Sequence, residues 1–350
     1  DVIEKGLKGP GFPVEVYNVL GAGDAFMSGF LRGWLRDEPI ETCCSYANAG
    51  GAFAVSRLLC SAEYATFTEM QHFIKNGAET RAVRHDAALT HLHWATTRDA
   101  VTSYTKADRI FALAIDHRAQ LEIIADDCGA PRDQIKKFKS LALDAALSVS
   151  KGQKGFGMLL DGTYGRDALF KATGHNLWIG RPVEAPGSRP LDFEGGGSLA
   201  AKLIEWPINH IIKCLCFYHP DDPAELKEKQ DRELLRLHDA ARKLGRELLI
   251  EIICGKHGAL RDDTTASVID HLYQLKIKPD WWKLEAQQSP EAWTNIEKTI
   301  TSNDPFCRGI MMLGLDAPAD ELIDAFALAK PHRSVKGFAI GRTIFVEPAK

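Results

Sequence analysis

The chain has 350 residues, of which 45% are hydrophobic and 26% charged, and its formal net charge is −4. This balance predicts a globular protein without a basic excess, so nucleic acid is not expected as a partner. No apolar run approaches the roughly 20 residues that span a bilayer, and nothing resembles a signal peptide. The eight cysteines lack zinc or redox spacing. We therefore expect a cytoplasmic protein that contacts no membrane.

The first 80 residues predict a strand, a glycine turn and helices. Residues 14–20 alternate like a strand and run into Gly21-Ala-Gly-Asp24, after which a helical pattern continues through Trp34. Small residues at a helix N-terminus let backbone N–H groups approach a phosphate, and Asp24 would direct a carboxylate to the same place. A plain helix cap is the alternative for so short a motif. Two further helices are expected over 40–59 and 66–75.

The context of this motif resembles the C-terminal signature of ribokinase-like (PfkB-type) carbohydrate kinases. The sequence reads Asn18-Val-Leu-Gly-Ala-Gly-Asp24, then Ala25-Phe26 and, further on, Ala47-Asn-Ala-Gly-Gly51. The resemblance implies that Asp24 is the base for the substrate hydroxyl and that an intact kinase uses ATP and Mg2+. It also implies a site for the nucleotide phosphate, formed by Gly21, Ala22, Gly23 and Asn48.

This resemblance covers residues 1–80 and has two departures. Asn18 and Val19 stand where the signature has Asp and Thr, which puts any metal or phosphate role of these two positions in doubt. The sugar-binding portion and the lid of the family lie upstream of the signature. Because phosphate transfer needs both reactants positioned, we expect a C-terminal kinase fragment that does not act as a kinase by itself. The first residue is Asp1 rather than Met, which indicates a piece of a longer chain.

Residues 81–105 are polar and predict a connection between two domains. They carry His91 and His93, which alone would suit a metal ion, but no further ligand follows at a suitable spacing. A solvated linker is the favoured interpretation.

From residue 106 to 350, short apolar segments alternate with helical patterns. Eight strand–helix units match a (β/α)8 TIM barrel, and a doubly wound sheet, which would more often carry fewer strands, is the alternative. The α/β chain is thus expected to be a barrel preceded by the fragment of a ribokinase-like α/β domain, with both ends of the chain cut. The expected strands are 110–116, 156–161, 177–181, 211–218, 248–254, 280–285, 309–313 and 337–341. The expected helices include 132–148, 199–205, 223–244, 264–276, 289–301 and 319–330.

Four of the expected strands carry a charged residue that a barrel would bury: Asp116, Lys213, Glu251 and Lys283. Burial favours the neutral amine of a lysine, and only a neutral amine attacks a carbonyl to form a Schiff base, so Lys283 is the candidate nucleophile. A second cation, Lys213, would keep it deprotonated by like-charge repulsion. Glu251 would carry the proton transfers, and Asp116 would orient or deprotonate a substrate hydroxyl. The alternative is a structural ion pair of Lys283 with Glu251 or Glu285.

Residues that follow the strands predict how the substrate binds. Gly341 and Arg342 after the eighth strand, with Gly314 after the seventh, lie where barrels commonly bind phosphate, and Arg342 offers a bidentate grip. Arg118 and Asp161, after the first two strands, are further candidate substrate contacts.

These motifs look like those of Schiff-base (class I) aldolases of the tagatose-bisphosphate aldolase type. The residues that carry the resemblance are 114–118, 159–165, 212–214, 250–252, 282–285 and 341–342. It implies that Lys283 forms the imine, that Glu251 is the acid/base, and that Lys213 and Asp116 are the second lysine and the first-strand carboxylate of the family. No cofactor is implied for the aldolase. The third-strand loop, 181–189, departs from the pattern.

The order of the two parts resembles bifunctional proteins of myo-inositol breakdown. In them a 5-dehydro-2-deoxygluconokinase is fused to a 5-dehydro-2-deoxyphosphogluconate aldolase, which implies a sugar-acid phosphate cleaved to dihydroxyacetone phosphate and malonate semialdehyde. Arg181 or Arg189 would then meet the substrate carboxylate. The alternatives are a metal-dependent aldolase, for which His117, His219 and His257 form no convincing triad, and a non-catalytic barrel that binds a sugar phosphate and regulates the kinase. The sequence does not decide between a monomer and a homo-oligomer.

Overall fold

The structure, a computed structural model, describes residues 11–58, 60–101 and 109–350. The chain divides into two compact units with the boundary between Arg98 and Asp99. None of the helices in the described parts combines the length and apolar character that crossing a membrane requires.

The described part of the first unit is helical. Its core joins Phe53 of the second helix to Phe73 of the third, with ring centroids 4.9 Å apart, and adds Leu89 from the fourth helix. A capping box of Thr66 and Glu69 begins the third helix. The elements are α1 (Ala22–Trp34), α2 (Ile40–Ser56), η2 (Ser61–Glu63), α3 (Phe67–Asn76), η3 (Val83–His85) and α4 (Ala87–Val101).

Two sequence expectations for this unit need correction. Residues 14–20 form no strand; the N–H groups of Tyr17 and Asn18 donate to the carbonyl of Val55 at the end of α2. Alternation makes a strand only where another strand lies beside it, and the described part of this unit has none. The expected connection 81–105, where described, contains α4, and His93 on it pairs with Glu69 at 3.1 Å.

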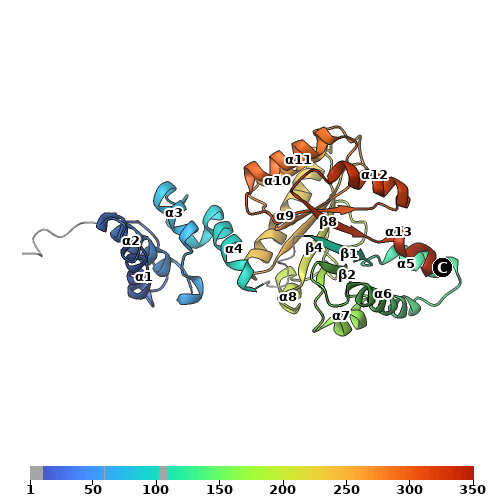
Figure 1. Ribbon diagram of the computed structural model, residues 1–350, viewed down its shortest axis with the longest axis horizontal. Helices are drawn as coiled ribbons and strands as arrows, with labels where there is room; N and C mark the ends of the chain where they lie inside the picture. The colour runs from blue at the N-terminus through green and yellow to red at the C-terminus, as the bar shows by residue number, and fades with distance from the viewer. Residues whose placement is uncertain (1–10, 59, 102–108) are drawn as a thin grey trace, which may run out of the picture. The chain divides into compact units, whose positions relative to one another are not determined.

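The second unit is a closed barrel of eight parallel strands in sequential order, which confirms the expected (β/α)8 fold. Figure 1 shows these strands inside a layer of helices. The strands are β1 (Ile110–Ala114), β2 (Phe156–Leu159), β3 (Trp178–Pro182), β4 (Ile211–Phe217), β5 (Leu248–Ile253), β6 (Trp281–Leu284), β7 (Gly309–Leu313) and β8 (Val335–Ile340). The helices are α5 (Ala119–Asp127), α6 (Gln134–Ser150), α7 (Arg166–Ala172), α8 (Leu199–Ile204), α9 (Ala224–Lys243), α10 (Thr264–Gln274), α11 (Pro290–Asn303), α12 (Ala319–Ala329) and α13 (Arg342–Ala349).

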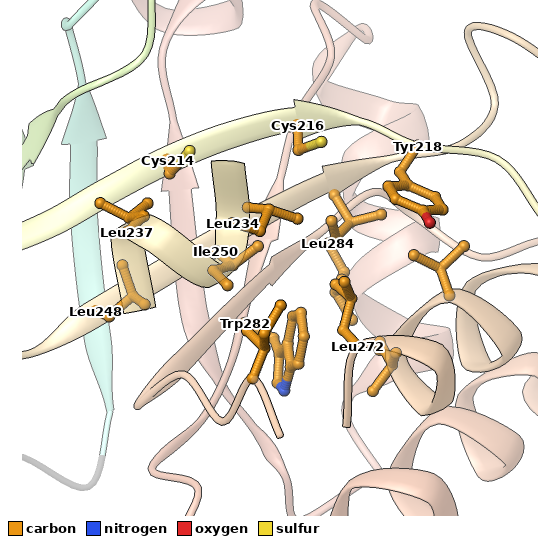
Figure 2. Close-up of a cluster of buried hydrophobic side chains, with 14 of the residues drawn as sticks. Cys214, Cys216, Tyr218, Leu234, Leu237, Leu248, Ile250, Leu272, Trp282 and Leu284 are labelled. Atoms are coloured by element: carbon orange, nitrogen blue, oxygen red, sulfur yellow. The ribbon is translucent and has the colours of Figure 1, made fainter. Parts of the chain in front are cut away.

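Each strand of the barrel has one face toward the helices and one toward the barrel axis. On β4, β5 and β6 the even-numbered side chains, such as Cys214, Ile250 and Trp282, pack with residues of α9 and α10 in one large core (Figure 2). The odd-numbered side chains face the interior, where Trp178 and Trp281 meet edge to face. This alternation decides which charged residues reach the barrel axis.

Candidate active site

Four of the charged residues predicted from the sequence meet at the barrel axis. Lys213, Glu251 and Lys283 occupy interior positions of β4, β5 and β6, and the ladder places Glu251 directly beside Lys283. The Lys283 ammonium donates to Glu251 Oε1 at 2.7 Å. The other oxygen of Glu251 lies 3.0 Å from Lys213 Nζ, and Asp116 Oδ2 lies 3.2 Å from the same nitrogen. Glu251 therefore bridges two lysines, and Lys213 links it to Asp116.

A fifth member of this cluster, Glu184, was not expected from the sequence. It follows β3, and its Oε1 accepts a hydrogen bond from Lys213 Nζ at 2.8 Å. Arg118 lies beside it, with Nη2 3.6 Å from Glu184 and Nη1 3.0 Å from Glu194. The five residues of the cluster are between 3% and 6% exposed, so their charges interact with little screening.

Two effects set the pKa values of Asp116, Glu251 and Lys213: burial, and the opposite charges that lie beside each group. Burial alone raises the pKa of Asp116, but the charges around it, led by Lys213, outweigh burial and hold that pKa well below its usual range. At Glu251, burial again raises the pKa, but the charges of Lys213 and Lys283 outweigh burial. The pKa of Glu251 is therefore lowered as well. For Lys213, burial lowers the pKa, but Asp116, Glu184 and Glu251 together raise it well above its ordinary value. The carboxylates of Asp116 and Glu251 are therefore ionised and Lys213 is protonated at neutral pH.

The cluster lies in a cavity of about 580 Å³ at the C-terminal ends of the strands. Gly314, Gly341 and Arg342 line the side of the cavity at β7 and β8. A Cβ at Gly341 would lie 2.1 Å from the carbonyl oxygen of Ala114, so only glycine fits there. α13 begins directly after it, and the first N–H groups of a helix have no acceptor within the helix. Together with the Arg342 guanidinium, which is 3.4 Å from Asp316, they give this corner of the cavity a positive character.

Asp161, a predicted substrate contact, lies away from this cavity. Asp161 is fully buried, pairs with Lys139 of α6, and accepts N–H bonds from Thr163 at 2.9 Å and Tyr164 at 2.7 Å. β2 ends at Leu159, so the alternation that would aim Asp161 inward does not continue to it. Its position is that of a structural ion pair, not a substrate ligand.

The arginines expected to meet a substrate carboxylate are likewise occupied. Gly180 and Pro182 hold the interior positions of β3, so Arg181 faces the helices and its guanidinium stacks 4.1 Å from the ring of Trp206. Burial lowers the pKa of Arg181 to about 10. Arg189 pairs with Asp222. The structure brings neither to the cavity lining.

Several lining residues were missed or left without a role. Glu184 has the interior parity of β3 (178, 180, 182), and extending that count by one step would have found it. Glu285 has the parity of Lys283, and its Oε1 accepts N–H bonds from Cys254 at 2.6 Å and Gly255 at 2.9 Å. Lys256 lies in a loop with no periodicity, so no sequence signal points to it.

Within residues 11–58, 60–101 and 109–350, no group of three or more His, Cys, Asp or Glu side chains is arranged to hold a metal ion. Of the three histidines weighed for a metal site, only His117 lines the cavity, and burial lowers its pKa to about 4.

In the first unit, the glycine turn directly precedes α1. Gly21 precedes α1 with φ 77°, a left-handed value that favours glycine, and a Cβ there would lie 2.5 Å from the Tyr64 hydroxyl. Asn18 closes the turn by accepting the N–H of Leu20 at 2.7 Å. Ala22, Gly23 and the exposed Asp24 form the first turn of α1, and Asn48 lies on α2.

Comparisons with known families also divide the chain in two parts, with the division between residues 66 and 69, inside the first compact unit. Residues 69–350 match the family described as "Uncharacterized protein conserved in bacteria (DUF2090)", and residues 3–66 match the pfkB family carbohydrate kinases. An ATP-dependent ribose-1-phosphate kinase of Halopiger xanaduensis is 48% identical over 48 residues, which are 14% of this chain and 16% of that protein. A 5-dehydro-2-deoxygluconokinase of Geobacillus kaustophilus is 32% identical over 73 residues, 20% of this chain and 22% of that protein. The chain thus spans between a sixth and a quarter of these curated relatives, and the N-terminal part is a kinase fragment.

The barrel has the fold of an aldolase. A fructose-bisphosphate aldolase of Plasmodium falciparum superposes with a TM-score of 0.53 at 13% identity, covering 75% of this chain and 86% of that one. At this identity the likeness concerns the fold.

Proposed function

The chain belongs to the DUF2090 family of bacterial proteins, and we propose that its barrel is a Schiff-base aldolase whose nucleophile is Lys283. The observation that carries the proposal is the contact of Lys283 with Glu251 at 2.7 Å inside a cavity that also contains Lys213 and Asp116. A lysine nucleophile needs an adjacent base to take its proton, and Glu251 lies at that distance.

The residues have distinct roles in the proposed reaction. Lys283 passes a proton to Glu251, and its nitrogen forms a bond to the substrate ketone carbon. A second proton then moves from that nitrogen to the former ketone oxygen, which becomes a hydroxyl. Glu251 returns a proton to the resulting hydroxyl, which leaves as water to give the iminium. Asp116 accepts the proton of the β-hydroxyl while the carbon–carbon bond breaks, which releases an aldehyde and leaves an enamine on Lys283. Asp116 returns its proton to the enamine carbon, and addition of water to the resulting iminium releases the ketone product from Lys283.

Lys213 acts on the carboxylates rather than on the substrate. Its ammonium, bound by Asp116, Glu184 and Glu251, keeps three buried acids together without mutual repulsion. Fixed charges of this kind are arranged before the substrate arrives, which lowers the cost of reorganisation during reaction.

We further propose that the substrate is 5-dehydro-2-deoxygluconate 6-phosphate, cleaved to dihydroxyacetone phosphate and malonate semialdehyde in myo-inositol breakdown. The positive corner of the cavity at Gly341 and Arg342 suits the phosphate. The kinase fragment, similar to a 5-dehydro-2-deoxygluconokinase, supports a bifunctional chain whose kinase makes this phosphate from ATP. In an intact kinase, the N-terminus of α1 after Gly21 and Ala22 would hold the γ-phosphate and Asp24 would receive the proton of the sugar hydroxyl. The eight cysteines form no disulfide within the described residues, which suits a reducing compartment, and we place the protein in the cytoplasm.

The test is release of dihydroxyacetone phosphate from that substrate by the full chain and by Lys283→Arg. Arginine keeps the charge but stays protonated, so a structural ion pair would survive the change and a nucleophile would not. We expect a folded variant whose turnover falls by several orders of magnitude, and an unchanged rate for the exposed control Lys298→Met. Near-normal cleavage by Lys283→Arg would contradict the proposal. Binding of the substrate without cleavage by the unmodified chain would instead indicate a non-catalytic barrel.

A further inference from the structure

The cavity has two chemically different sides. At β1, β3 and β8 it is lined by charged groups, among them Asp116, Glu184 and Arg342. At β4, β5 and β7 it is also lined by a hydrophobic cluster that we call the apolar wall: Leu215, Phe217, Ile253 and Leu313. Phe217, Ile253 and Leu313 are buried.

A lysine, Lys256, lies at the outer end of the apolar wall. Lys256 follows β5 by three residues, lines the cavity, and has its Nζ 4.5 Å from the centroid of the Phe217 ring. Arg118, Lys213 and Lys283 each hold a carboxylate of the protein, whereas Lys256 makes no ion pair within the described residues. It is therefore available to an anion from outside.

The loop that carries Lys256 is fastened to the strand of the nucleophile. Glu285, two residues after Lys283, accepts the N–H groups of Cys254 and Gly255, which directly precede Lys256. The backbone at Lys256 is thus held relative to Lys283, although the side chain itself is exposed.

We propose that the apolar wall and Lys256 form the subsite for the aldehyde half of the substrate. The subsite fits a short fragment with a methylene next to the reacting carbon and a carboxylate at its end, because an apolar surface satisfies a CH2 group and a lysine satisfies a carboxylate. A hydroxyl in place of the methylene would lose its hydrogen bonds to water against this wall. The inference rests on the proposed aldolase function and adds to it the residues that select an acid substrate.

The first experiment compares kcat/KM for the proposed sugar-acid phosphate and for its C1 amide, which has the same shape without the charge. Lys256→Met is expected to lower kcat/KM for the acid by about tenfold or more, mainly through KM, and to leave the amide unchanged. Lys256→Arg should restore most of the loss, and Lys298→Met is the matched surface control. Unchanged cleavage of the acid by Lys256→Met, or an equal loss for acid and amide, would overturn the subsite.

The second experiment tests the apolar wall with the analogue that carries a hydroxyl at carbon 2. An apolar pocket rejects an added hydroxyl by up to about a hundredfold, so we expect the unmodified chain to prefer the 2-deoxy substrate by at least about tenfold. Ile253→Thr should narrow that preference. Equal cleavage of both substrates by the unmodified chain would contradict the assignment.

A separate measurement distinguishes failure of the subsite from failure of the aldolase. Dihydroxyacetone phosphate lacks the carboxylate, so borohydride should trap it on Lys283 equally well in the unmodified chain and in Lys256→Met. If neither protein is trapped, the aldolase proposal fails and the subsite falls with it. If both are trapped and acid selectivity does not depend on Lys256, only the subsite is wrong.

Discussion

Replacing Lys213 by methionine is the perturbation whose size the structure defines best. The change removes the cation that lies 2.8 Å from Glu184, 3.0 Å from Glu251 and 3.2 Å from Asp116. In the variant, Glu251 still has its ion pair with Lys283, and Glu184 still has its ion pair with Arg118. These two carboxylates therefore retain a positively charged partner. Removing one partner of a buried ion pair costs about 3–5 kcal/mol. We expect a loss near 3 kcal/mol in the free energy of unfolding, since two of the three carboxylates retain a partner.

The pH dependence of this loss has a defined sign. The pKa of Asp116 and of Glu251 is depressed despite burial, so their stabilising contribution is present above their ordinary pKa values of 3.8 and 4.5 and is lost as pH falls through the lower folded values. The pKa of Lys213 is raised despite burial, so its contribution is present below 10.5 and is lost as pH rises through the folded value. The difference between the two proteins should therefore be greatest between about pH 4.5 and pH 10.5 and should shrink in acid.

The assay is urea unfolding followed by tryptophan fluorescence of the barrel, at pH 7 and at pH 4 or below. Lys298→Met controls for loss of a lysine as such. Two results would refute the claim that Lys213 stabilises the buried carboxylates. One is a Lys213→Met protein as stable as the unmodified chain at pH 7. The other is a difference in the free energy of unfolding that grows in acid.

The remaining predictions concern residues at the edge of the site. Arg342→Ala removes a charged contact to the substrate phosphate, so kcat/KM should fall by an amount equivalent to about 1.5–3 kcal/mol and the preference for phosphorylated substrate should weaken; a preserved preference would place the phosphate elsewhere. Asp161→Asn leaves the buried ammonium of Lys139 without its carboxylate, so unfolding should become easier by about 3–5 kcal/mol while KM stays the same. A raised KM with unchanged stability would reinstate Asp161 as a substrate ligand.

The barrel could be predicted from the sequence because its strands are short apolar runs at regular spacing. Lys283 and Glu251 interrupt such runs, and a charge inside a buried strand is conspicuous in any sequence. Their contact also follows from pattern alone, since both have the interior parity of adjacent strands.

Features that depend on where a strand ends were harder to predict. Asp161 was expected to face inward, but β2 ends two residues earlier; Glu184 lies in a Pro- and Gly-rich loop yet keeps the interior direction of β3. Arg181 was expected to meet the substrate carboxylate, but it is one residue out of step with the interior positions 178, 180 and 182 of β3. Counting along the strand from Trp178 would have shown this. Residues 14–20 alternate like a strand but have no neighbouring strand in the described part of the first unit, and no local pattern reports a missing neighbour.

The formation of a covalent imine at Lys283 tests the central claim most directly. The full chain is incubated with dihydroxyacetone phosphate, reduced with borohydride, digested and analysed by mass spectrometry. The account predicts an irreversible adduct on the peptide that contains Lys283, and no adduct on that peptide in Lys283→Arg. No adduct on Lys283 in a chain that cleaves the substrate, with cleavage abolished by a chelator, would contradict the account and favour a metal-dependent reaction.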